Sequence, residues 1–232
     1  MLTVAAASDL QTAMPAVASR FEKDTGCRVA LTFGSSGNFF TQIQNGAPFD
    51  VFLSADVEYP RRLDRAGLVE PGTVSEYARG RLVLWTRRDS GIDVSRGLGA
   101  LGDANVRRIA IANPEHAPYG RAAVAALQAD GVYDRVRSKI VMGENISQAA
   151  QFAESGAADV GLIALSLARS PALERAGVYV EVRETLYPPI EQAAVVIASS
   201  RQKALARQLV DALKQPAVAR ILQSYGFAPP AR

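Results

Sequence analysis

Two serines flanked by glycines, Gly34-Ser35-Ser36-Gly37, are the residues of this sequence best suited to chemistry. They follow the apolar run 29–33 and precede a segment that is predicted to be helical. Serine hydroxyls and the backbone N–H groups of a helix N-terminus converge on a small anion without the help of a cation. Serine is also favoured as the N-cap of an ordinary helix. The motif therefore predicts either an anion-binding turn or a simple helix cap.

Three other places share the same order of an apolar strand, small or polar residues and a helix start. They are Ser8, Pro118-Tyr119 and Asn145-Ile146. In open α/β sheets, ligands bind in the crevice beyond the carboxyl ends of the strands. The recurrence favours a pocket in which hydroxyls and N–H groups hold an anion through neutral donors. The alternative is that any α/β protein caps its helices in this way.

Competing chemistry has weaker support in the sequence. The segment 97–102 matches the dinucleotide pattern G-x-G-x-x-G, but no convincing strand precedes it and a poor helix follows, so we reject it. His116 is the only histidine and can serve as a general base with Ser8 or Ser36, which leaves a serine- and histidine-dependent hydrolase as an alternative. One histidine and one cysteine make a zinc site improbable.

Composition is that of an ordinary globular protein. The chain has 232 residues, 48% of them hydrophobic, and a net charge of +3. Basic residues occur as short pairs such as Arg61-Arg62, which argues against a nucleic-acid partner. Cys27 is the only cysteine, which excludes an intramolecular disulfide. The chain enters a predicted strand directly after Met1, so we expect either a cytosolic protein or one whose signal peptide was replaced by a start methionine.

Strands and helices alternate along most of the chain, which predicts an α/β fold with largely parallel sheets. A predicted helix over 8–24 contains Pro15, so we expect a kink or a late start there. The pattern restarts after the loop 72–80, which predicts two lobes, 1–80 plus 190–232 and 81–189. The predicted strands are 2–7, 28–33, 50–54, 81–86, 106–112, 140–142, 159–164, 178–182 and 192–198. The other predicted helices are 38–45, one ending near 65, 121–129, one beginning at 145, 202–214 and 217–225.

At these turns the sequence resembles the periplasmic molybdate-binding proteins of ABC importers, the ModA family. The resemblance extends nearly from end to end, and its specificity comes from the combination of motifs. The matching motifs are Ala5-Ala6-Ala7-Ser8, Gly34-Ser35-Ser36-Gly37, the segment 45–56 (NGAPFDVFLSAD), the segment 113–120 (NPEHAPYG) and Tyr225-Gly226-Phe227.

The resemblance implies a two-lobed type II binding-protein fold, with helices on both faces of parallel-rich sheets and a tetrahedral oxyanion in the inter-lobe cleft. It implies a monomeric, periplasmic, non-enzymatic protein without a cofactor, which delivers molybdate or tungstate to the membrane permease of an ABC importer. The implied residues donate to the oxyanion and do not bind molybdenum directly. They are the hydroxyl and backbone of Ser8 and of Ser36 and the backbone N–H groups of Tyr119 and Ile146, with Asp9 and Ser35 as further candidates.

Two departures from the family pattern bear on selectivity. Part of the family has a tyrosine donor where Ala164 stands, whereas Tyr119 occupies a position that is small in those members. Asp9 would repel a dianion if its carboxylate pointed inward, and we expect it instead in the first turn of its helix, where negative charge is favourable. An inward-facing Asp9 would accept the proton of phosphate. Phosphate and sulfate therefore remain the alternative ligands.

Overall fold

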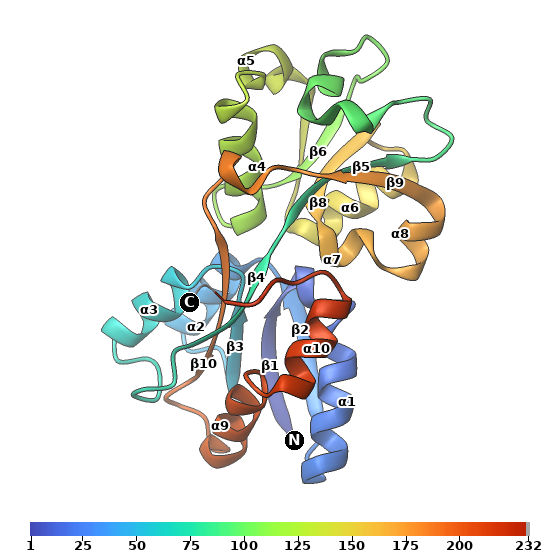
Figure 1. Ribbon diagram of the computed structural model, residues 1–232. Coiled ribbons are helices and arrows are strands. Elements are labelled where there is room, and N and C mark those ends of the chain that lie inside the picture. The colour runs from blue at the N-terminus through green and yellow to red at the C-terminus, as the bar shows by residue number, and fades with distance from the viewer. Residues whose placement is uncertain (231–232) are drawn as a thin grey trace. The chain divides into compact units, whose positions relative to one another are not determined.

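The computed structural model describes residues 1–230 (Figure 1). The chain divides into two compact units, which we call unit 1 (Met1–Arg79 with Glu191–Arg232) and unit 2 (Gly80–Ile190). The two lobes predicted from the sequence place each junction one residue away from these boundaries. The last two residues of the predicted first lobe lie outside the described residues.

Unit 1 is built on a five-stranded mixed sheet with the order β2-β1-β3-β10-β4. Strand β1 pairs in parallel with β2 and β3, whereas β10 runs antiparallel to β3. The predicted parallel pairing thus holds for three strands, and the return strand β10 makes the sheet mixed. The strands are β1 (Leu2–Ala7), β2 (Val29–Gly34), β3 (Val51–Ser54), β4 (Ser75–Gly80) and β10 (Ile190–Val196).

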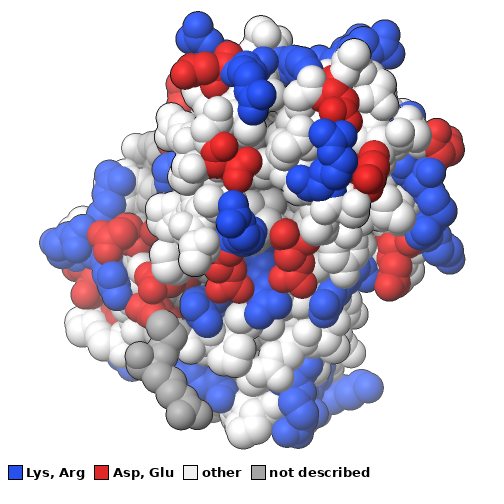
Figure 2. Space-filling model, turned by 45° about the horizontal axis from the view of Figure 1, so that its top comes forward, with Lys and Arg blue, Asp and Glu red and all other residues white. Residues whose placement is uncertain are grey.

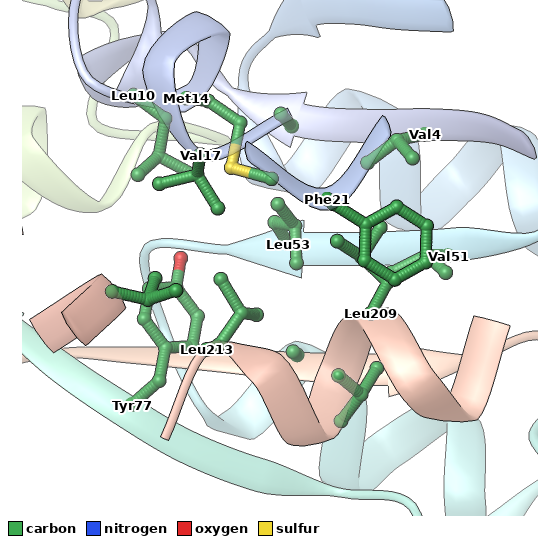
Figure 3. Close-up of a cluster of buried hydrophobic side chains, with 14 of the residues drawn as sticks. Val4, Leu10, Met14, Val17, Phe21, Val51, Leu53, Tyr77, Leu209 and Leu213 are labelled. Carbon is green, nitrogen blue, oxygen red and sulfur yellow. The ribbon is translucent and has the colours of Figure 1, made fainter. Parts of the chain in front are cut away.

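Alternating side chains of this sheet enter two apolar cores. Val4, Val51 and Leu53 join the core under one set of helices, and this core is drawn in Figure 3. Ala5 and Phe52 point to the opposite core. The first core is covered by α1 (Met14–Thr25), α9 (Lys203–Ala212) and α10 (Pro216–Ser224), and the second by α2 (Ser36–Gln44) and α3 (Glu58–Arg65).

Unit 2 repeats this topology in a sheet with the order β7-β6-β8-β5-β9. Strand β6 pairs in parallel with β7 and β8, and β5 runs antiparallel to both β8 and β9. Strands β5 and β10 hold the same place in their sheets. Strand β5 begins close to the point where the chain enters unit 2, and β10 begins close to the point where it returns to unit 1. The strands are β5 (Leu82–Arg87), β6 (Ile109–Ala112), β7 (Ile140–Gly143), β8 (Val160–Ala164) and β9 (Gly177–Glu181).

Two longer helices pack on this second sheet. Helix α4 (Pro118–Ala129) follows β6, and α6 (Ile146–Ser155) follows β7 and packs on β6, β7 and β8. The short helices are α5 (Tyr133–Val136), α7 (Leu165–Ala168) and α8 (Pro171–Ala176), and the 3-10 segments are Ser8–Leu10, Val94–Gly102, Arg137–Lys139 and Glu184–Leu186. No helix within 1–230 is both long enough and apolar enough to span a bilayer. The predicted α/β fold is confirmed.

Several predicted elements need correction. The helix predicted over 8–24 is a short 3-10 turn, Ser8–Leu10, followed by α1 from Met14. Pro15 explains the late start, because proline is tolerated in the first turn of a helix but breaks its interior. The loop predicted over 72–80 contains strand β4, and the short helices α5, α7 and α8 were missed. The glycine motif 97–102 lies within 3-10 structure, in agreement with its rejection.

Candidate functional site

The carboxyl ends of β1, β2 and β3 meet at one edge of the unit 1 sheet because these strands are parallel. The turns that follow them contain Ser8, Ser36 and Ser54 at or just beyond the strand ends. Strand β10 runs the other way and begins at this edge, where Ala193 pairs with Ser54 and Gln192 lies one residue further out. The sheet thus brings the predicted unit 1 donors Ser8 and Ser36 to a common edge.

The two serines of the glycine-flanked turn have different roles. Ser35 is the N-cap of α2, and its Oγ accepts a hydrogen bond of 3.3 Å from the N–H of Asn38. The helix-cap interpretation is therefore confirmed for Ser35. Ser36 is the first residue of α2, and its Oγ accepts a hydrogen bond of 3.0 Å from the N–H of Ala55, in the turn after β3.

Ser36 keeps two donors that the described residues do not use. Its side chain is buried, with 1% of the residue exposed, and within 1–230 neither its hydroxyl hydrogen nor its backbone N–H donates to an acceptor. Because the Ala55 N–H occupies the acceptor side of the hydroxyl, the O–H is left to point toward a further group. A buried hydroxyl and N–H at a helix N-terminus are suited to an anion.

Ser8 and Asp9 lie in the 3-10 turn after β1 and are both buried. Asp9 lies in a first turn, as the sequence predicts, but this turn belongs to the short 3-10 segment Ser8–Leu10 and not to the long helix predicted over 8–24. The turn has three residues, too few for an appreciable helix dipole, and Asp9 is 0% exposed. Its Oδ2 instead accepts a hydrogen bond of 2.7 Å from Nε2 of Gln192.

Unit 2 presents a second edge of the same kind, beyond the carboxyl ends of β6, β7 and β8. Tyr119 is the second residue of α4 and is buried. Ile146 begins α6, where the side chain of Asn145 caps the N–H groups of Ser147 and Gln148 at 3.1 and 3.0 Å. Within 1–230 the N–H of Ile146 has no acceptor, so this buried donor is also unused. The predicted helix start at Asn145 is confirmed.

Glycines allow both unit 2 helices to approach the ends of their strands closely. A Cβ at Gly120 in α4 would collide with the carbonyl of Ala112, the last residue of β6. A Cβ at Gly143, the last residue of β7, would lie 2.7 Å from the N of Ala149 in α6. Only glycine permits these distances, and they place the first turn of each helix against the sheet edge.

Three residues at these edges were missed by the sequence interpretation. Ala55 acts through its backbone, so no side chain identifies it. Gln192 was visible as a polar residue beside the apolar run 193–198. Ser166 lies two residues after the end of β8, in the first turn of α7, and it is buried like Ser8, which directly follows β1. The alternation of strand, serine and helix start was therefore an available signal for Ser166.

The chemistry of these edges is that of neutral donors. Besides tyrosines, the buried polar and charged side chains within 1–230 are Ser, Thr, Gln and one Asp, without a Lys or Arg. The described residues contain no group of three or more His, Cys, Asp or Glu side chains that could hold a metal ion. A serine nucleophile needs an adjacent base. The Ser36 hydroxyl donates to no acceptor in the described chain, which fits anion binding better than catalysis.

Apart from the buried Asp9, the charged side chains within 1–230 lie at or near the surface, where the two signs are mixed. On the face shown in Figure 2, Lys and Arg alternate with Asp and Glu. Arg61, from one of the basic pairs of the sequence, forms ion pairs of 3.0 and 2.9 Å with Glu58 and Glu76. This face lacks the single-sign stripe that a nucleic-acid partner would require.

Comparison with known proteins gives one consistent family. The family model described as bacterial extracellular solute-binding protein matches residues 2–228. The chain is 40% identical over 225 residues to the molybdate-binding protein ModA of Azotobacter vinelandii, covering 97% of this chain and 88% of that protein. It is 39% identical over 211 residues to the ModA of Rhodobacter capsulatus, covering 91% of this chain and 81% of that protein.

A solved structure agrees with these relatives. The periplasmic molybdate-binding protein of Azotobacter vinelandii superimposes with a TM-score of 0.93 at 36% sequence identity, and the match covers 100% of both chains. The family resemblance noted in the sequence is therefore confirmed along the whole chain.

Proposed function

The chain belongs to the ModA family of bacterial extracellular solute-binding proteins, and on that premise we propose that it captures molybdate and delivers it to the permease of an ABC importer. Tungstate is expected to bind as well, since it is a tetrahedral dianion of nearly the same size. The protein acts in the periplasm as a monomer and catalyses no reaction.

The observation that carries this proposal is the unused donor pair of Ser36. A buried hydroxyl and a buried N–H without acceptors cost free energy unless a ligand accepts from them. Molybdate accepts hydrogen bonds on all four oxygens and carries no proton near neutral pH. A site of neutral donors matches such a ligand without cationic side chains.

We assign the donors to both units. In unit 1 they are the hydroxyl and backbone of Ser8 and of Ser36, and in unit 2 the backbone N–H groups of Tyr119 and Ile146. Ser35 has the capping role, and Ala164 brings no side-chain donor.

A ligand panel tests the proposal. Ligands that bind only the folded protein stabilise it, and at a concentration a hundredfold above Kd the gain is about 2.7 kcal/mol. For a protein of this size that gain raises Tm by about 5–10 °C. Molybdate and tungstate should each give such a shift, and calorimetric titration should give one site per chain. Sulfate and phosphate at equal concentration should have little effect, and a larger shift with either would reassign the ligand.

A further inference from the structure

Three buried polar side chains form a chain of hydrogen bonds inside unit 1. The hydroxyl of Tyr77 in β4 donates to Oε1 of Gln192 at 3.3 Å, and Nε2 of Gln192 donates to Oδ2 of Asp9 at 2.7 Å. Asp9 and Gln192 are 0% exposed and Tyr77 is 4% exposed. Tyr77 lies among the apolar side chains of the core in Figure 3. Burying polar groups in such a position costs free energy of desolvation, and their presence therefore suggests a functional role.

The direction of these hydrogen bonds is set by Asp9. An ionised carboxylate only accepts hydrogen bonds, so the NH2 group of Gln192 faces Asp9 and its oxygen faces Tyr77. Burial raises the pKa of Tyr77 well above its ordinary value, and the negative charge of Asp9 raises it further. Tyr77 therefore stays a neutral donor and fixes the amide of Gln192 in this orientation.

Asp9 is the residue next to Ser8, one of the proposed donors. Adjacent side chains of a 3-10 turn leave the backbone about 120° apart, so Ser8 and Asp9 point in different directions while Asp9 is held. A carboxylate that turned toward the donors would repel a dianion in a region of low dielectric constant. It would also accept a proton from an oxyanion that still carries one.

Given the oxyanion-binding function proposed above, we infer that Gln192 is a positioning residue that determines specificity by holding the Asp9 carboxylate away from the anion. The site then presents donors alone and prefers a fully deprotonated dianion such as molybdate. Without Gln192, a carboxylate that lacks this hydrogen bond weakens molybdate binding and favours phosphate. Tyr77 supports this role by orienting the amide.

A double-mutant cycle of Gln192→Leu and Asp9→Asn tests the inference by calorimetric titration. Gln192→Leu should weaken molybdate binding at least tenfold and lower the ratio of molybdate to phosphate affinity by a similar factor. Asp9→Asn should bind molybdate at least as tightly as the wild type, since asparagine keeps an oxygen for Gln192 and removes the charge. The molybdate affinity of the double variant should lie within about threefold of that of Asp9→Asn, because the carboxylate that repels the anion is absent from both.

Control variants separate this role from a general effect on the core. Thr73→Val removes a buried hydroxyl that accepts from the N–H of Val196, also in β10, and it should leave the affinity ratio unchanged. If Gln192→Leu does not fold, Tyr77→Phe takes its place in the cycle. Its loss of molybdate affinity should be smaller, and Asp9→Asn should restore the affinity in the same way.

Three results would overturn the inference. The first is a molybdate affinity of Gln192→Leu equal to that of the wild type. The second is a loss of molybdate affinity from Gln192→Leu that is equally large in the wild type and in Asp9→Asn. The third is a preference of Gln192→Leu for molybdate over phosphate that equals that of the wild type. Any of them in a protein whose wild type binds molybdate refutes the role of Gln192 and leaves the proposed function intact. A wild-type protein that binds no oxyanion refutes the proposed function and this inference together.

Discussion

Replacing Ser36 with alanine removes a single hydroxyl to which we assign the donation of a hydrogen bond to the anion. A hydrogen bond to a charged group contributes about 1.5–3 kcal/mol. Since about 1.4 kcal/mol corresponds to a tenfold change in Kd, Ser36→Ala should weaken molybdate binding roughly ten- to a hundredfold. The backbone N–H of residue 36 is kept, so some affinity should remain.

The same substitution has a predictable effect on stability. The Ser36 hydroxyl also accepts the 3.0 Å hydrogen bond from the Ala55 N–H, and this contact is buried. Leaving a buried donor unsatisfied costs about 1–3 kcal/mol, so the free energy of unfolding of the ligand-free protein should fall by that amount. The loss of affinity and the loss of stability are separate quantities and should both be seen.

Calorimetric titration with molybdate, well below the melting temperature, measures the first quantity, and denaturant unfolding without ligand measures the second. Thr41→Ala is a matched control, because it removes another hydroxyl of α2, which donates to the Gly37 carbonyl. Its affinity should equal that of the wild type. Wild-type affinity of a folded Ser36→Ala variant would refute the role of this hydroxyl in binding.

Further predictions concern other residues of the two edges. Ser8→Ala should also weaken binding roughly ten- to a hundredfold, without loss of α1, which begins further along the chain; an unchanged Kd would remove Ser8 from the site. His116→Ala should leave molybdate affinity unchanged in the same titration, and loss of binding there with an intact Ser36→Ala would contradict the neutral-donor model. Gly120→Ala should lower the free energy of unfolding by about 1–3 kcal/mol, because the new Cβ meets the Ala112 carbonyl. The control Gly99→Ala, whose Cβ has no neighbouring atom within 4 Å, should leave the free energy of denaturant unfolding unchanged.

The sequence by itself determined the features that depend on neighbouring residues. Strand β1 has the predicted bounds Leu2–Ala7, because a short apolar run with a polar residue after it is a local signal. The helix starts at Ser35 and Asn145 were also predictable, since a cap and the N–H groups that it accepts lie within three residues. The fold class and the two candidate edges follow from the order of such local elements.

Only the tertiary structure decided which residues, far apart in the sequence, meet at these edges. Strand β4 has weak local signals and takes its place beside β10, far along the chain. The Ser36 hydroxyl meets Ala55, and Asp9 meets Gln192 at a separation of 183 residues. A buried polar group needs a hydrogen-bond partner, but sheet pairing determines which partner is within reach. The sequence therefore shows that the carboxylate of Asp9 needs a partner if it is buried. The register of β10 against β3 determines that this partner is Gln192.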